Sequence, residues 1–204
     1  MMDAICSVNE ISGAAFLPSK ASCTSKVDLV SRPNCNITAI RIEGSLLSVT
    51  HRSNVLKKLL KKYGAIEELH SKNSAILWQE IRDVSLIEKK STDLIWKISC
   101  PPSRSPEIML NIAKNCKGEA IYDWGGGLIW FKMNANSTNC GHIIRSTLDS
   151  TGGHATLFTA PKEVRQKIDV FHPQPDQLKA LTRRIKNGFD PLQILNPNRM
   201  YQGI

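Results

Sequence analysis

Five histidines are the residues best suited to acid–base chemistry in this chain of 204 residues. A histidine that accepts the proton of a hydroxyl substrate needs a pocket and a shifted pKa. His51 and His70 stand in or beside helical patterns with charged neighbours, which predicts surface positions. His142 and His154 are predicted to be structural, and His172 is predicted to fix the entry to the last helix. The sequence therefore identifies no catalytic base.

Six cysteines are the next candidates, since they could form three disulfides or bind a metal. The chain is too large to depend on disulfides, and its first residues carry neither the basic nor the apolar part of an export signal. No two cysteines form a C-x-x-C pair, and no histidine follows one at zinc-finger spacing, although Cys140 and His142 are close. We therefore expect a cytoplasmic protein with reduced thiols and no metal site. The cysteines are Cys6, Cys23, Cys35, Cys100, Cys116 and Cys140.

Two tryptophans, Trp124 and Trp130, flank the glycine run at 125–127. They could pack within a sheet or form a wall beside a flat cofactor, and packing is the favoured interpretation. The glycines do not form a G-x-G-x-x-G phosphate loop. The sequence thus contains no signature for holding a dinucleotide pyrophosphate.

The formal net charge of +9 raises the question of nucleic-acid binding. The densest basic run, at 57–62, alternates lysines with leucines at helical spacing, which favours a solvated helix face over a phosphate-binding stripe. Hydrophobic residues make up 41% and charged residues 22% of the chain, as in ordinary globular proteins. The longest apolar stretches are far shorter than the roughly 18 to 20 residues of a membrane-spanning helix.

The pattern of apolar residues predicts alternating strands and helices after residue 35. From residue 93 the predicted order is β, α, β, β, α, β, with the glycine run as a hairpin turn. This order indicates an α+β fold of ferredoxin-like type, an antiparallel sheet with helices on one face. Predicted strands are Ile37–Ile42, Asp93–Cys100, Glu119–Trp124, Leu128–Met133 and His154–Thr159. Predicted helices are Ser48–Tyr63, Ser74–Asp83, Ser105–Ala113, Thr138–Ser150 and Asp176–Lys186, the last ended by Gly188.

The same pattern divides the chain into three parts. Residues 1–35 are rich in Ser, Ala and Cys without a sustained period, which predicts an irregular segment. Residues 36–171 form the predicted α+β domain. Residues 172–204 hold the last helix and a proline-rich tail whose apolar side chains should dock on another surface.

At this tail the sequence resembles a known family. The run His172–Ile204 resembles the C-terminus of the FAD-binding subunits of bacterial glycolate oxidases, members of the FAD-linked oxidase superfamily of vanillyl-alcohol oxidase type. Further blocks agree in order along the chain, so the resemblance covers nearly all of it. They are Val8–Pro18, Thr38–Ser48 followed by Trp78–Asp83, and Tyr122–Trp130.

The resemblance implies that this chain is the cap half of such a subunit, without its FAD-binding half. It further implies a truncated subunit of an FAD-dependent complex that oxidises glycolate, a small 2-hydroxy acid, to glyoxylate. Its partners would be a second flavin subunit and an iron–sulfur subunit. The complex would be cytoplasmic or held at the inner membrane peripherally, with no transmembrane segment in this chain.

The family motif at the tail, Asn-Pro-Gly-Arg or Asn-Pro-Gly-Lys, reads Asn-Pro-Asn-Arg at 196–199. The resemblance implies that Asn196, Asn198 and Arg199 contact the cofactor. Asn198 replaces a glycine where a positive φ is expected, which asparagine tolerates well. The alternative is that Asn196 caps a turn and Arg199 pairs with a carboxylate on the missing half.

Two other functions stay open at this point. A ferredoxin-like module with a basic surface can bind RNA, although the aromatic strand motif typical of such modules is absent. The chain could also be an inactive gene remnant. Copurification with flavoprotein partners would favour the oxidase subunit, and salt-dependent retention on single-stranded RNA would favour the binding module.

Overall fold

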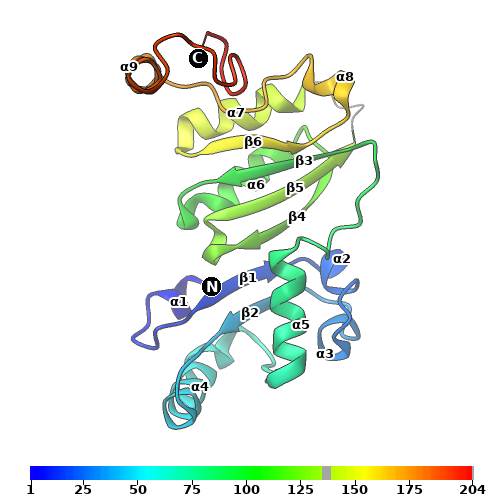
Figure 1. Ribbon diagram of the computed structural model, residues 1–204. Coiled ribbons are helices and arrows are strands. Elements are labelled where there is room, and N and C mark those ends of the chain that lie inside the picture. The colour runs from blue at the N-terminus through cyan, green and yellow to red at the C-terminus, as the bar shows by residue number, and fades with distance from the viewer. Residues whose placement is uncertain (135–138, 204) are drawn as a thin grey trace.

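A six-stranded antiparallel sheet organises the chain, with strand order β2-β1-β4-β5-β3-β6. The computed structural model describes residues 1–134 and 139–203. Helices pack on both faces of the sheet, and the C-terminal helix lies beyond its β6 edge (Figure 1). The strands are β1 (Gly13–Leu17), β2 (Ile37–Arg41), β3 (Asp93–Ser99), β4 (Gly118–Asp123), β5 (Leu128–Asn134) and β6 (His154–Thr159).

Nine α-helices and three short 3₁₀ turns are found within the described residues. The α-helices are α1 (Met2–Ile5), α2 (Ser19–Ser22), α3 (Asp28–Ser31), α4 (Leu46–Leu60), α5 (Ser71–Arg82), α6 (Ser105–Ala113), α7 (Cys140–Thr151), α8 (Lys162–Arg165) and α9 (Asp176–Phe189). The 3₁₀ turns are η1 (Lys61–Tyr63), η2 (Pro102–Arg104) and η3 (Trp124–Gly126).

The predicted ferredoxin-like unit is confirmed by the sheet order β4-β5-β3-β6 and by the position of α6 and α7. Alternate residues of a strand point to opposite faces of the sheet. On one face, Trp96, Ile98, Ile129 and Phe131 are buried against α6 and α7. This apolar layer holds the two helices on one side of the four strands, as the sequence pattern predicted.

The N-terminal segment departs from the prediction. Residues 1–35 were expected to be irregular, but β1 lies inside the sheet, paired with β2 on one side and β4 on the other. Its Ala15 and Leu17 are buried in a second core with Leu77 and Ile81 of α5. Because β1 has only five residues and α1 to α3 have four each, none is long enough to show a clear period. This second core includes Ile121 of β4, whereas the residues directly before and after Ile121 pack against the first core. Because successive residues of a strand point to opposite faces, the second core lies on the face opposite α6 and α7.

The expectation of six reduced thiols is wrong for one pair. Cys116, just after α6, and Cys140, at the start of α7, form a disulfide with a Cα–Cα distance of 5.8 Å. The packing of α6 against α7 brings these residues together across 24 positions of sequence. The other cysteines are free, and of these Cys100 is buried.

The last helix also runs further than predicted. Gly188 was expected to end it, but α9 continues to Phe189 and is followed by Asp190, where φ is −140° and ψ is 69°. The Asp190 carboxylate accepts hydrogen bonds from the backbone N–H groups of Ile194 and Leu195 and is paired with Lys186. The helix therefore ends where a buried aspartate starts to organise the following turn.

The predicted start of a helix at Thr138 lies outside the described residues, as does Ile204 at the end of the tail. No helix within residues 1–134 and 139–203 has both the length and the apolar content needed to cross a membrane.

Candidate functional site

The open part of the sheet is the most distinctive surface of the molecule. On β3, Lys97 lies between Trp96 and Ile98, which are buried toward α6 and α7, so its own side chain projects from the opposite face. The second core covers this face at β1 and β4. Near the start of β3 the segment before residue 89 also reaches the face, since the Lys132 ammonium donates to the carbonyl of Glu88. The face stays open around Lys97.

Two indole rings, those of Trp124 and Trp130, lie beside the Lys97 ammonium, and Phe158 packs on Trp130; we call these three aromatic side chains the aromatic frame. The Lys97 ammonium lies 5.8 Å from the ring centroid of Trp130 and 6.0 Å from that of Trp124. Phe158 meets Trp130 edge-on, with ring centroids 5.0 Å apart. Trp124 is 63% exposed and Phe158 is 61% exposed. Large exposed aromatic side chains beside a cation are typical of a surface that binds a ligand or another protein.

The turn that carries Trp124 is strained. Trp124 has a φ of 52°, in the left-handed region that bulky residues rarely adopt. The Asp123 carboxylate accepts a 2.7 Å hydrogen bond from the Trp124 N–H and holds this conformation. Gly126, with a φ of 104°, lies so close to α6 that a Cβ would be 2.6 Å from the Ser105 hydroxyl. The glycine run predicted as a hairpin turn is confirmed, and Trp124, the residue directly before it, is mostly exposed.

Packing was the favoured prediction for both tryptophans, and it holds for only one of them. Trp130 packs partly against the second core. Trp124 is mostly exposed, so the packing prediction is wrong at this position. The reason is the positive φ of Trp124 itself, which removes it from the alternation of the preceding strand. The glycine run directly after Trp124 is the sequence signal that could have identified the exposure of this tryptophan.

Charged groups near the frame differ in how they are compensated. Burial raises the pKa of Asp123, and the hydrogen bond from Trp124 only partly opposes this. Burial alone would raise the pKa of Glu119, but hydrogen bonds from Lys20 and Lys132 lower it overall. Lys132 pairs with Glu119 at 3.1 Å. The side-chain ammonium of Lys97, on the neighbouring strand, forms no ion pair or hydrogen bond with any residue in the described ranges, and its contacts are with the two indole rings.

The three residues expected to contact a cofactor lie elsewhere, in the C-terminal tail beyond α7 and β6 (Figure 1). Asn196 and Asn198 have φ values of 47° and 58°, so the positive φ expected at Asn198 is confirmed. The Asn198 side chain accepts a 2.7 Å hydrogen bond from the Gly203 N–H. Arg199 is exposed. No hydrogen bond, ion pair or ring contact among the described residues joins these three side chains to the aromatic frame.

The histidines follow the predictions only in part. His51 and His70 are exposed as predicted, but His142 and His154 are exposed as well, so the structural role expected for them is wrong. Both stand near the start of their element, where side chains are less enclosed by neighbours. His172 is confirmed as the residue that fixes the approach to α9. Its ring contacts Asp149 at 3.2 Å and accepts from the Ala155 N–H at 3.4 Å.

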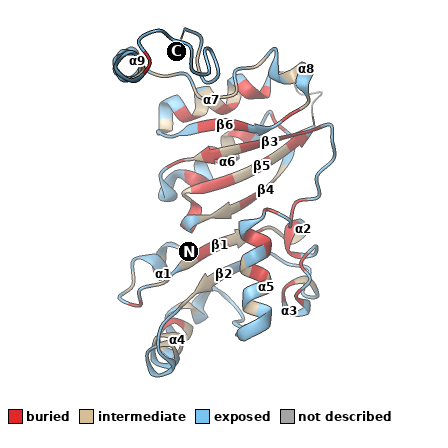
Figure 2. Ribbon diagram, in the orientation of Figure 1, coloured by how far each residue is buried: buried red, intermediate tan, exposed pale blue. Residues whose placement is uncertain are grey.

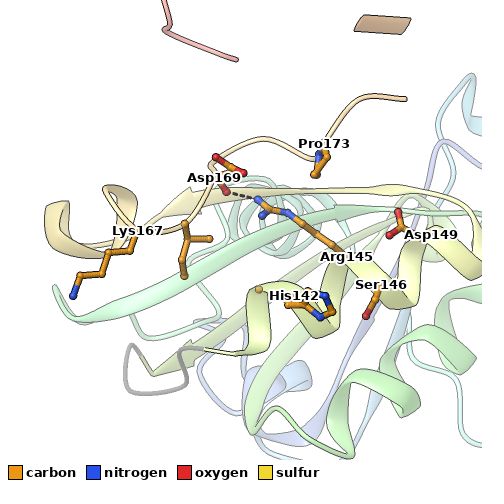
Figure 3. Close-up of a pocket in the computed structure, with 9 residues that line it drawn as sticks. His142, Arg145, Ser146, Asp149, Lys167, Asp169 and Pro173 are labelled. Carbon is orange, nitrogen blue, oxygen red and sulfur yellow. Dashed lines mark hydrogen bonds between the residues drawn. The ribbon is translucent and has the colours of Figure 1, made fainter. Parts of the chain in front are cut away.

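A shallow pocket of about 370 Å³ lies between α7 and the segment that leads to the tail (Figure 3). Arg145 crosses it and donates hydrogen bonds to the carbonyls of Asp169 and Phe171, the latter at 3.1 Å. Its guanidinium also lies 5.4 Å from the Trp96 ring centroid, and burial lowers its pKa. Arg145 is thus engaged in fixing residues 169–171, which lead to the tail.

Comparison with known proteins identifies relatives of the chain. No protein-family model matches it. Over 124 residues, 61% of this chain, it is 33% identical to the glycolate oxidase subunit GlcE of Escherichia coli (strain K12). The chain resembles a glycolate oxidase subunit. The resemblance inferred from the sequence blocks is therefore confirmed.

The fold has a solved counterpart. A 4-ethylphenol oxidase from Gulosibacter chungangensis, in complex with isoeugenol, matches 93% of this chain with a TM-score of 0.51 and 11% sequence identity. At that identity the likeness concerns the fold alone, and it supports the predicted α+β architecture. The chain spans 31% of the length of GlcE and 48% of the length of the 4-ethylphenol oxidase.

The residues present fit only one part of a flavin nucleotide. Aromatic side chains of the frame could lie against a flat ring. The glycine turn cannot cradle a pyrophosphate, because Gly125 and Gly126 are buried and a Cβ on Gly125 would be 2.0 Å from Ile5 Cδ1. The backbone of this turn is closed off by protein atoms. This glycine turn therefore does not fit the phosphate end of FAD.

Proposed function

We propose that this chain is the cap part of an FAD-dependent glycolate oxidase subunit and works against a flavin-binding half that lies outside residues 1–204. The observation that carries the proposal is the open sheet face with its aromatic frame, in a chain that resembles about a third of GlcE. FAD would be held by the other half through its phosphates. This chain would contribute a wall over the reacting end.

The C-terminal segment supports the same view, because it has an apolar surface without a partner in the described structure. Leu178, Leu181 and Ile185 lie on one side of α9, at intervals of three and four residues, and are 46%, 46% and 53% exposed. Phe189 continues the stripe and is 87% exposed. Figure 2 shows α9 and the tail almost entirely exposed. We name these four residues the α9 stripe and infer that it packs against the flavin-binding half.

The tail would then bring its polar residues to the cofactor. Asn196 and Arg199 sit on a turn that is shaped by positive φ angles and by the buried Asp190. Arg199 could pair with a phosphate or carboxylate, and Asn196 and Asn198 could hydrogen-bond the flavin edge. This role for Asn196, Asn198 and Arg199 stays a proposal.

The reaction proposed for the complex is the oxidation of glycolate to glyoxylate, with FAD accepting the electrons. A second flavin subunit and an iron–sulfur subunit would complete it. The complex would work in the cytoplasm, attached peripherally to the inner membrane through these partners. Each of these points rests on the similarity to the glycolate oxidase subunit and belongs to the proposal.

Coexpression tests the proposal directly. The 204-residue chain is produced with the flavin-binding part of a glycolate oxidase subunit on a separate plasmid, and one partner carries the affinity tag. We expect a yellow complex that reduces an artificial electron acceptor when glycolate is added. We also expect the chain produced alone to be colourless. A yellow preparation of the chain alone, or the absence of any complex, would contradict the proposal.

A second function is favoured by one specific observation. The open face of a ferredoxin-like sheet with exposed aromatics beside lysines is a surface on which single-stranded RNA can stack. Trp124 and Phe158 have the exposure that stacking needs. Retention of the chain on single-stranded RNA that falls as salt increases, and that is lost in W124A, would favour this module over the oxidase subunit.

A further inference from the structure

Lys97 is a cation without a counter-ion at the centre of the open face. It occupies the middle of β3, between β5 and β6, and its side chain is half-buried. Within residues 1–134 and 139–203 its ammonium group has no carboxylate or hydrogen-bond partner, only the two indole rings. A cation–π contact orients an ammonium group but leaves its charge uncompensated.

If another protein surface covered this face, the uncompensated charge of the Lys97 ammonium would become energetically costly. If the flavin-binding half packs over the aromatic frame, water leaves the Lys97 ammonium, and an unpaired buried charge is strongly destabilising. An anion must then accompany the charge. That anion comes either from the covering protein or from a bound ligand.

The surroundings of Lys97 favour a small ligand. Thr156 lies directly opposite Lys97 in the β3–β6 register, and Ser99 lies two residues further along the same face. Hydroxyl groups beside an ammonium suit a carboxylate that carries a neighbouring hydroxyl. The aromatic frame around them would keep water from the ion pair and so strengthen it.

We propose that Lys97 binds the carboxylate of a small 2-hydroxy acid, oriented between Trp124 and Trp130, and that it thereby selects anionic substrates. This inference rests on the proposed function, since it assigns the substrate-binding group of the same site. Lys97 acts as a binding residue and takes no proton in this role.

The test uses three variants of the full chain. K97M removes the charge and keeps an unbranched side chain, and K97R keeps the charge. K132M is the matched control, because Lys132 lies on the same sheet and its ammonium already pairs with Glu119. Each variant is first shown to unfold thermally like the unchanged chain.

Binding is measured by tryptophan fluorescence of the free chain, titrated with glycolate and with the neutral analogue glycolamide at constant ionic strength. We expect saturable quenching by glycolate and none by glycolamide. The quenching should persist in K132M, weaken in K97R and disappear in K97M. Saturable glycolate quenching that is equally strong in K97M and in the unchanged chain would overturn the inference.

The assembled complex supplies the second readout. There K97M should raise KM for glycolate by about tenfold or more and change kcat by less than about threefold, which is the signature of lost substrate binding. A rise in KM supports the inference even where the free chain binds too weakly to be detected. An unchanged KM in K97M overturns it while the proposed function stands.

Two further outcomes are decisive. If K97M no longer assembles with the flavin-binding half although K132M does, the counter-ion belongs to the partner protein and the inference is wrong. If the complex never oxidises glycolate, the proposed function fails. In that case, quenching by glycolate that depends on Lys97 still supports an anion site at this lysine. If no such quenching is seen either, both proposals are overturned.

Discussion

The buried carboxylate of Glu80 in α5 accepts a 2.7 Å hydrogen bond from the hydroxyl of Ser25, which lies 55 positions earlier in the chain. The same carboxylate accepts the Lys26 backbone N–H at 2.8 Å. Glu80 is 6% exposed and has no basic partner among the ion pairs of the described residues. These two hydrogen bonds tie the N-terminal segment to the helix that covers β1.

Removing this acceptor should destabilise the fold. In E80A the Ser25 hydroxyl and the Lys26 N–H lose their partner in a buried site, which should lower the free energy of unfolding by about 2 kcal/mol. Urea denaturation followed by circular dichroism measures the change. D28A is the control, since the Asp28–Arg32 pair is exposed and should matter by less than about 1 kcal/mol. Equal stability of E80A and D28A would contradict the role assigned to Glu80.

Two glycines should respond in opposite directions to alanine. In G126A a Cβ would meet the Ser105 hydroxyl at 2.6 Å, and the φ of 104° would strain the backbone. This variant should lose roughly 1–3 kcal/mol of stability and alter the emission of Trp124. In G188A no atom lies within 4 Å of the new Cβ, and the residue is helical, so the chain should gain up to about 1 kcal/mol. Thermal unfolding of both variants decides the sign of each effect.

The sequence predicted the fold best where elements are long and regular. Residues 93–159 show clear alternation in their strands, and their order leads to the sheet observed. The N-terminal part was missed because its link to the rest depends on distant partners such as Ser25 and Glu80, which no local pattern connects. The same is true of Cys116 and Cys140, whose pairing depends on the packing of two helices.

The candidate site was predictable only in its components. Trp124, Trp130 and the glycine run could be identified from the sequence, but their arrangement around Lys97 depends on strand register. Lys97 was missed because a single lysine in an apolar strand has no distinctive neighbours in sequence. Asp123 was missed because its importance comes from burial and from the strained turn that follows it.

The pH dependence of stability should reflect Asp123. Since burial raises its pKa in the folded chain, the folded state binds this proton more tightly than the unfolded state does. Its ionisation therefore lowers stability as pH rises from the ordinary aspartate pKa of about 3.8 through the raised pKa of the folded state. D123N stays neutral and keeps an oxygen for the Trp124 N–H, so it should remove this part of the decline. Urea denaturation across that pH interval compares the two chains, and identical profiles would contradict the prediction.

The α9 stripe should affect assembly and leave the free chain unchanged. Leu181 and Ile185 are about half exposed, so the double variant L181S/I185S removes little buried apolar area and should change stability by less than about 1 kcal/mol. Against the flavin-binding half the same side chains would be buried, and their loss should weaken association by about tenfold or more. Binding is measured by titration calorimetry between the two purified parts. K179S is the control, because Lys179 is exposed and lies one or two positions, not three or four, from the nearest residues of the stripe; it should bind within about threefold of the unchanged chain once the ionic strength is raised. If the double variant binds as well as K179S, the stripe is not the docking surface, and the apolar tail after Asp190 would have to supply the contact instead.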